Sequence, residues 1–306
     1  MSLPVYVADW LWEEADRGQL KLGALVDVTG SEAHHAINAR RTKIGEHIEV
    51  VDGYGLRAQL EVTHIDKDRL VGTLVHLVRE ELHSPTITLI QALAKGGRDE
   101  QAIETASEYG VDVVMPWQAD RSVVRWQGSA KVARGIERWQ ATALAAAKQS
   151  RRSWVARVDP LVDSPALAQW IAQAVAAGTQ VFLCHESATI KLTHVLRQSN
   201  VGSSIARTGT TSHDAYSDKD APDVNILDAN ISGVRADAPC SERAERPELP
   251  DFSDIALIVG PEGGVSPEEI AAFEKAGAQT VLLGEHVMRA SSAGSWAIAV
   301  IRALSA

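Results

Sequence analysis

Five short apolar runs between residues 86 and 284 constrain the fold more than any other feature of the sequence. A strand with one face in water alternates polar and apolar residues. These runs are apolar almost throughout, so each predicts a strand buried on both faces. Segments typical of helices lie among them, including the alanine-rich residues 131–150. Strands and helices in this alternation predict an α/β domain with a mostly parallel sheet. The runs read TITLIQALA, VDVVMPW, QVFLCHE, IALIVG and TVLLG.

The first 75 residues have a different pattern, in which apolar and polar residues alternate over short stretches. The sequence Asp52-Gly53-Tyr54-Gly55 between two of these stretches is typical of a hairpin turn. A short helix is predicted at 31–41, with Ser31 as its N-cap. Several short strands and one helix indicate a compact β-barrel domain at 1–75, followed by the α/β domain at 83–306.

The formal net charge is −10, which taken alone argues against a general nucleic-acid-binding protein. Part of the acidity lies at 199–250, where Ser, Asp, Gly, Pro and Asn are frequent and large apolar residues are few. This composition predicts a flexible insertion in the second domain. Binding responds to local patches, so a basic surface elsewhere remains compatible with the net charge.

The two cysteines, Cys184 and Cys240, lie far apart and offer neither a disulfide framework nor zinc spacing. His34-His35 lacks a third ligand within sequence reach, and His185-Glu186 lacks the HExxH spacing. No run is long enough to span a membrane, and the first residues do not resemble a signal peptide. We therefore expect a cytoplasmic protein with no metal and no membrane partner.

The loop Gly260-Pro261-Glu262-Gly263-Gly264 follows an apolar run and precedes a predicted helix. In open α/β sheets, ligands bind at the carboxyl ends of the strands, where this loop would lie. Its spacing differs from GxGxxG, Pro261 lacks an N–H for a phosphate, and Glu262 would repel a pyrophosphate. The loop therefore favours a neutral or cationic ligand. The alternative is an ordinary tight turn with an acid in solvent.

A second candidate lies at 282–294, LLGEHVMRASSAG, where a strand leads through a glycine turn to the start of a helix. Small residues here allow a ligand to approach the backbone closely. Arg289 stands just before the helix, at the end where the helix dipole disfavours a cation. This placement makes Arg289 a candidate for contact with an anion or a carbonyl oxygen. The alternative is a surface arginine beside a helix cap.

The two loops and further motifs along most of the chain resemble the small-subunit ribosomal RNA uracil-N3 methyltransferase family (RsmE type) of the SPOUT class. No counterpart is recognised for 199–250. Many members have E-T-A after the arginine, whereas this chain has Ala290-Ser291-Ser292-Ala293, so a catalytic role for that glutamate cannot be transferred. The other matching motifs, in family order, are His34-His35 with Arg41 and Gly45, Ala94-Lys95-Gly96, Arg121-Ser122-Val123, Glu137-Arg138-Trp139-Gln140 and Gln149-Ser150-Arg151-Arg152.

The resemblance implies a PUA-like barrel before a SPOUT domain with a trefoil knot at about 255–306. It implies S-adenosylmethionine as cofactor and N3 of a specific uridine in 16S rRNA as acceptor, in free RNA or in the assembled small ribosomal subunit. A homodimer is expected, because SPOUT enzymes typically pair near the donor site. The alternatives are methylation at another RNA position (a ribose 2′-O or another base) and a non-catalytic RNA-binding protein of the same fold. The residues predicted to bind the donor are Val259, Gly260, Pro261, Glu262, Gly263, Gly264, Leu283, Gly284, Val287, Met288 and Ser292.

Arg289 is predicted to be catalytic, because a guanidinium can stabilise negative charge that develops on the uracil carbonyl oxygens. His286 is a candidate base, with a bystander histidine as the alternative. Trp126 and Tyr54 are candidates for stacking on bases. The residues predicted to contact RNA are Arg40, Arg41, Lys43, Arg121, Arg125, Arg151 and Arg152, with solvated surface pairs as the alternative for Arg40-Arg41 and Arg151-Arg152.

Overall fold

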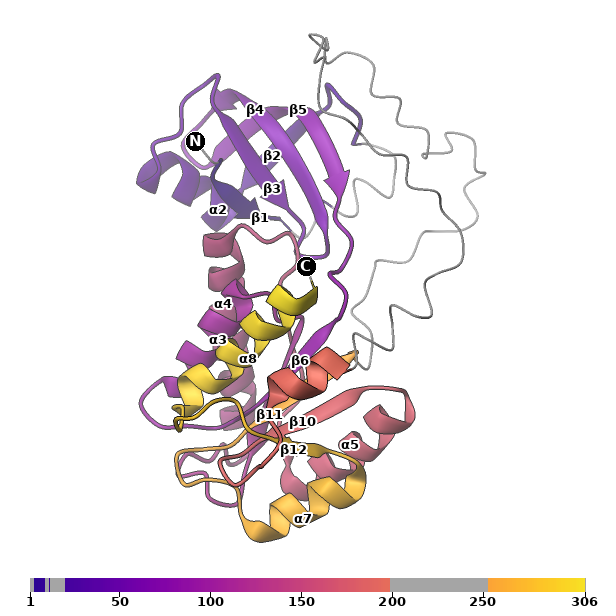
Figure 1. The fold of residues 1–306 in the computed structure, drawn as a ribbon. Coiled ribbons are helices and arrows are strands. Elements are labelled where there is room, and N and C mark those ends of the chain that lie inside the picture. The colour runs from indigo at the N-terminus through magenta and orange to yellow at the C-terminus, as the bar shows by residue number, and fades with distance from the viewer. Residues whose placement is uncertain (1–2, 9–10, 12–19, 199–252, 306) are drawn as a thin grey trace, which may run out of the picture.

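The computed structural model describes residues 3–8, 11, 20–198 and 253–305, and two β-sheets organise this part of the chain (Figure 1). The predicted insertion at 199–250, with Cys240, lies outside the described residues. The sheet nearer the N-terminus has the strand order β1-β3-β4-β5-β2. Its strands are β1 Val5–Val7, β2 Leu25–Thr29, β3 His47–Val51, β4 Leu56–Ile65 and β5 Arg69–Arg79.

The alternating pattern of the N-terminal residues gives this first sheet one buried and one exposed face. In β2, Val26 and Val28 are fully enclosed in the core while Leu25 is exposed. The predicted hairpin is confirmed, because β3 and β4 pair antiparallel on either side of residues 52–55. Asp52 closes the turn: its Oδ1 accepts hydrogen bonds from the backbone N–H of Tyr54 at 2.6 Å and of Leu56 at 3.0 Å.

A helical segment follows β2, but Ser31 is not its N-cap, so that prediction is wrong. Helix α2 covers Gly30–His34, the residue before it is Thr29 in an extended conformation, and no side chain caps it. The chain continues as a π-helix over His35–Ala39. The helix begins early because Gly30, with φ of 67°, turns the chain directly out of the strand. Capping preferences read from sequence do not include that constraint.

The second sheet confirms the prediction of a parallel α/β domain. Its strand order is β12-β10-β11-β6-β7-β8, with β9 also paired to β7, and every recorded pairing is parallel. The last apolar run forms a shorter strand than expected. The strands are β6 Ile87–Ala92, β7 Val113–Gln118, β8 Arg157–Val158, β9 Val162–Asp163, β10 Gln180–Cys184, β11 Ile255–Val259 and β12 Gln279–Val281.

Helices cover both faces of this sheet, which explains why its central strands are apolar throughout (Figure 1). Leu89 of β6 belongs to the core beneath α3, α4 and α8, whereas the next residue, Ile90, belongs to the core beneath α5 and α7. None of the helices that the structure describes has the length and apolar character needed to span a membrane. The helices are α3 Arg98–Glu108, α4 Ser129–Ser150, α5 Ser164–Ala176, α7 Pro267–Ala276 and α8 Ala290–Ser305.

The two sheets are joined where the β3–β4 turn meets residues 153–155. The N–H of Gly55 donates to the carbonyl of Ser153 at 3.1 Å, and the N–H of Val155 donates to the carbonyl of Gly53 at 3.0 Å. The side chain of Trp154 packs so closely that a Cβ at residue 55 would lie 2.7 Å from its ring. Backbone pairing and close packing therefore fix the barrel on the second sheet.

Helix α8 is anchored at its C-terminal end by Arg302. The guanidinium donates to the carbonyl oxygens of Pro85 at 2.7 Å and Gly110 at 2.5 Å, and forms an ion pair with Asp112 at 2.8 Å. Asp112 is only 2% exposed, so this is a buried ion pair. The trefoil knot expected at about 255–306 stays a prediction.

Candidate active site

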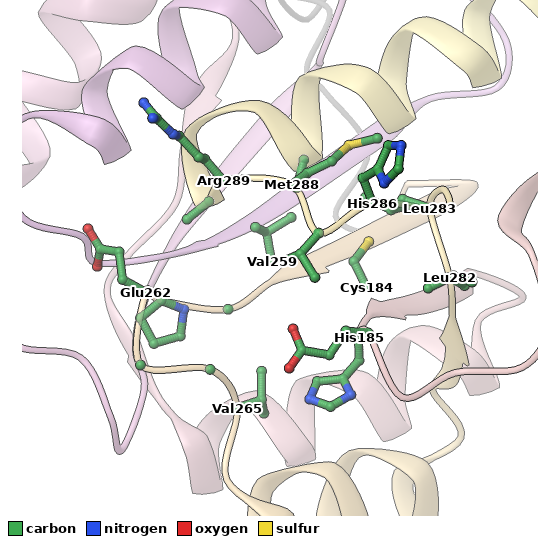
Figure 2. Close-up of a pocket in the computed structure, with 18 of the residues that line it drawn as sticks. Cys184, His185, Val259, Glu262, Val265, Leu282, Leu283, His286, Met288 and Arg289 are labelled. Carbon is green, nitrogen blue, oxygen red and sulfur yellow. The ribbon is translucent and has the colours of Figure 1, made fainter.

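A cavity of about 650 Å³ opens at the carboxyl ends of β10, β11 and β12 (Figure 2). Its volume falls within the range typical of small-molecule sites. The structure brings both candidate loops together here, although they are separate in sequence. The predicted donor residues that line the cavity are Val259, Gly260, Pro261, Glu262, Gly263, Gly264, Leu283, Gly284, Val287 and Met288.

Ser292 is the predicted donor residue that does not line the cavity. Its N–H and hydroxyl both point back to the carbonyl of Arg289, at 3.0 and 3.3 Å, where they close the first turn of α8. Sequence reasoning missed another part of the wall, which consists of Cys184, the last residue of β10, and of His185 and Glu186 directly after it. The available signal was the apolar run ending at these residues, but its position beside β11 depends on the strand order.

The loop after β11 is shaped by contacts that two of its glycines permit. The N–H of Gly264 donates to the carbonyl of Pro261 at 2.9 Å. Gly264 has φ of 73°, a backbone conformation that residues with a side chain rarely adopt. A Cβ on Gly263 would lie 2.9 Å from the carbonyl oxygen of Arg121. Ser266 then caps α7 in a capping box with Glu269. The motif is therefore a fixed turn against the loop that follows β7.

The carboxylate of Glu262 is engaged within the protein, which corrects the sequence argument about its charge. One oxygen accepts from Arg98 Nη1 at 2.9 Å and from the N–H of Lys95 at 3.3 Å. Burial alone would raise the pKa of Glu262, but hydrogen bonds from its own backbone, from Arg98 and from Lys95 lower it overall. Figure 2 shows the carboxylate directed away from Cys184 and His185. Its charge is thus balanced by Arg98 instead of facing the centre of the cavity.

Arg289 lines the cavity and is exposed. Among the described residues, no hydrogen bond or ion pair to its guanidinium is found. Its carbonyl accepts the first N–H donors of α8, so the backbone is fixed while the side chain remains available. This geometry allows Arg289 to contact a ligand, as the sequence predicts.

Other groups in the wall limit the chemistry of the site. Burial raises the pKa of the Cys184 thiol to about 12, so the thiolate needed for nucleophilic catalysis is scarce near neutral pH. The N–H of Ser187 donates to Nδ1 of His185 at 3.2 Å, which leaves Nε2 as the nitrogen carrying the proton when the ring is neutral. His286 also lines the cavity and is exposed.

Two residues predicted to meet RNA are structural instead. Arg152 donates to the carbonyls of Ser107 at 2.9 Å and Val111 at 2.8 Å, and burial lowers its pKa. Trp126 is 5% exposed and packs edge-on against Trp139, so it cannot stack on a base. Trp126 belongs to the core beneath α4, and Arg152 is held by backbone carbonyls at the end of α3 and after it. The other predicted RNA contacts are exposed: Arg40, Arg41, Lys43, Arg121, Arg125 and Arg151.

Comparison with known proteins agrees with this architecture. A family model described as an RNA methyltransferase domain matches residues 80–209 and 227–302, and one described as an RNA methyltransferase PUA domain matches residues 28–75. A Mycobacterium tuberculosis protein named ribosomal RNA small subunit methyltransferase E is 32% identical over 92% of this chain and 88% of its own length. The chain belongs to this methyltransferase family.

More distant members of the ribosomal RNA small subunit methyltransferase E family also align along nearly the whole chain. The Bacillus subtilis protein of that name is 24% identical over 94% of this chain and 93% of its own length. A crystal structure of the Neisseria gonorrhoeae enzyme bound to S-adenosyl methionine superposes with a TM-score of 0.68 at 21% identity, covering 99% of this chain and 98% of that one. At this identity the superposition establishes the shared fold.

Proposed function

We propose that this protein transfers a methyl group from S-adenosylmethionine to N3 of a specific uridine in 16S rRNA of the small ribosomal subunit. Family membership supports the ribosomal RNA methyltransferase activity. The observation that carries the proposal is the cavity after β10, β11 and β12, where the two loops of the motif meet. The uridine and its N3 atom follow from the motif resemblance, which extends into the N-terminal domain.

The residues that line the cavity suit this donor. Val259, Val265 and Leu283 offer an apolar surface for an adenine ring, and glycine-rich turns expose backbone groups that can read its edge. The carboxylates of Glu186 and Glu285, which also line the cavity, complement the positive charge of the sulfonium and the amino group. When bound, S-adenosylmethionine supplies an activated methyl group. The cavity walls would hold this donor and orient its methyl group toward the acceptor.

The chain must also manage the acceptor. Uracil N3 loses a proton before it can attack, and negative charge then spreads to the flanking carbonyl oxygens. Arg289, at the edge of the cavity and without an internal partner among the described residues, is placed to stabilise that charge. His286, which lines the cavity and is exposed, is the candidate for accepting the proton, because Nδ1 of His185 is already occupied by Ser187. A nucleobase within folded RNA must be flipped out of its helix to reach these side chains.

We extend the proposal to organisation and assembly. Residues 1–75 act as a PUA-like RNA-binding domain and residues 83–306 as a knotted SPOUT domain, working in the cytoplasm, where small subunits are found. The protein acts as a homodimer that pairs near the donor site. Val123 and Val287 support this pairing, since they are 72% and 78% exposed on the loop after β7 and beside the cavity. Sedimentation of the wild type and of a V123D/V287D variant tests it: a dimer converted to a monomer is expected, and a monomeric wild type would contradict it.

Mass spectrometry of 16S rRNA tests the reaction. RNA from a strain lacking the gene is expected to lose one methyl group at one uridine, and wild-type protein with S-adenosylmethionine should restore it in isolated small subunits. A methyl lost from a ribose or from another base would assign the enzyme to a different RNA position. Unchanged rRNA with no binding of S-adenosylmethionine in calorimetry would instead indicate a non-catalytic protein.

A further inference from the structure

The strand order divides the site between two sets of loops. The cavity is walled mainly by residues after β10, β11 and β12, whereas the adjacent loops after β6 and β7 carry exposed basic residues. Strand β11 pairs with β6, so the donor loop at 260–264 is a direct neighbour of the loop at 93–97. The basic residues here are Lys95, Arg121 and Arg125, which are exposed on the two loops, and Arg98, the partly exposed first residue of α3. Such residues suit the phosphates of a bound RNA.

The loop after β6 is fixed at its ends and little supported in its middle. Leu93 and Asp99 on either side are buried, with 0% and 2% of their surface exposed. Between them, Gly96 and Gly97 have φ of 69° and 73°, and no atom lies within 4 Å of the position a Cβ would take on either. In the part of the chain that the structure describes, no side-chain packing around Gly96 and Gly97 therefore constrains the chain between Lys95 and Arg98.

The side chain of Glu262, on the neighbouring loop, makes hydrogen bonds to both ends of this glycine pair. Its carboxylate holds the N–H of Lys95 at 3.3 Å and the guanidinium of Arg98 at 2.9 Å, on either side of the two glycines. Both Glu262 and Arg98 also line the cavity. One side chain thus connects the loop that walls the donor cavity to the loop that carries basic residues toward the RNA.

We propose that Glu262 is a positioning residue that couples the donor cavity to RNA binding by the loop after β6. This inference rests on the proposed function. A donor that orders the loop at 260–264 would fix Glu262, and Glu262 would then fix Lys95 and Arg98 for contact with phosphate. Thermodynamic linkage requires the effect to be reciprocal, so bound RNA raises donor affinity by the same factor. The charge of Glu262 has this role instead of contacting the sulfonium.

The test measures affinity for unmethylated small subunits with and without saturating S-adenosylhomocysteine, which occupies the site without reacting. Wild-type protein is expected to bind the subunit at least about fivefold more tightly with the nucleoside present, the lower end of typical coupling. In E262A this ratio should fall to about one, and E262Q, which keeps an acceptor oxygen, should give an intermediate value. E268A is the matched control, because Glu268 is an exposed acid of the next turn and does not line the cavity; it should keep the wild-type ratio.

A double-mutant cycle with R98Q separates coupling from general damage. If Glu262 acts through Arg98, R98Q alone should also lower the ratio, and the E262A/R98Q protein should give the same ratio as E262A. Thermal unfolding of each variant checks that the fold is retained. A wild-type ratio of one, or an E262A ratio equal to that of the wild type, would overturn the inference. Wild-type protein that binds no S-adenosylhomocysteine would overturn the proposed function itself.

Discussion

The two ends of α8 place arginines in opposite situations. Arg302 at the C-terminal end reaches three backbone carbonyls and the buried Asp112. Arg289 at the N-terminal end is exposed beside the cavity and has no partner among the described residues. A cation at a helix C-terminus also suits the helix dipole, whereas one at the N-terminus does not. The helix therefore has one end built for stability and one end whose charge is available for a ligand.

The largest effect is expected at the anchored end. Replacing Arg302 with Ala leaves the Asp112 carboxylate buried without its closest cation, which should lower the free energy of unfolding by about 3–5 kcal/mol. Chemical denaturation monitored by tryptophan fluorescence measures this loss. The catalytic rate of the protein that remains folded should stay near the wild-type rate. A loss of activity without a loss of stability would reverse the roles assigned to the two ends.

At the free end the expected pattern is the opposite. Arg289→Ala should reduce the single-turnover rate on the order of 10²–10³-fold, as for the loss of one group that stabilises developing charge. Donor affinity by calorimetry and the melting temperature should change little. Arg289→Lys should also be slow, because an ammonium cannot match the planar guanidinium. An unchanged rate at saturating RNA would remove Arg289 from the mechanism.

Two glycines that line the cavity, Gly263 and Gly284, repeat this contrast between a tightly packed position and a more open one. Gly263→Ala places a Cβ 2.9 Å from the Arg121 carbonyl, so the loop must shift, whereas a Cβ on Gly284 would meet Met288 at an ordinary 3.5 Å. Overpacking of this kind costs about 1–3 kcal/mol, so G263A should bind S-adenosylmethionine roughly 5- to 150-fold more weakly. G284A is the control for packing: its melting temperature should stay near the wild-type value, whereas that of G263A should fall. Equal losses of melting temperature in both variants would contradict a specific role for the Gly263 contact.

The smallest effect is expected on the barrel, where Arg40 and Arg41 are exposed like Arg289. Reversing both to Glu should weaken binding to the small subunit and reduce the slope of log affinity against log salt by about 1 to 2. Titrations at several salt concentrations measure the slope, and the melting temperature should hold. An unaltered slope would exclude this patch from the RNA interface.

Local patterns in the sequence were sufficient to predict most of the fold. The apolar runs are buried on both faces because helices cover both sides of the sheet, and such burial leaves a continuous signal along each strand. The hairpin at Asp52 was equally recognisable, since turn chemistry acts within four residues. The first residue of α2 could not be recognised in the same way, because it depends on where β2 ends.

The roles of charged and aromatic residues were harder to predict, because they depend on distant partners. Glu262 meets an arginine 164 residues away, which no pattern within the GPEGG motif discloses. Arg152 and Trp126 are of residue types that often contact RNA. In the fold, however, Arg152 donates to a carbonyl of α3 and Trp126 packs against Trp139 of α4. Arg289 is a candidate from sequence because it contradicts a local rule, the dipole preference, and such conflicts tend to mark functional positions.

The junction at residues 53–55 and 153–155 has a consequence for how one nucleotide is selected among many. Two backbone hydrogen bonds and a packed tryptophan keep the barrel from swinging relative to the cavity. The distance from the donor loops to the basic residues that are predicted to hold RNA is then fixed. If the proposed RNA contacts hold, we expect this fixed distance to select the nucleotide that reaches the cavity. Lengthening the junction should then change which nucleotide is methylated, a shift visible by mapping the modified position.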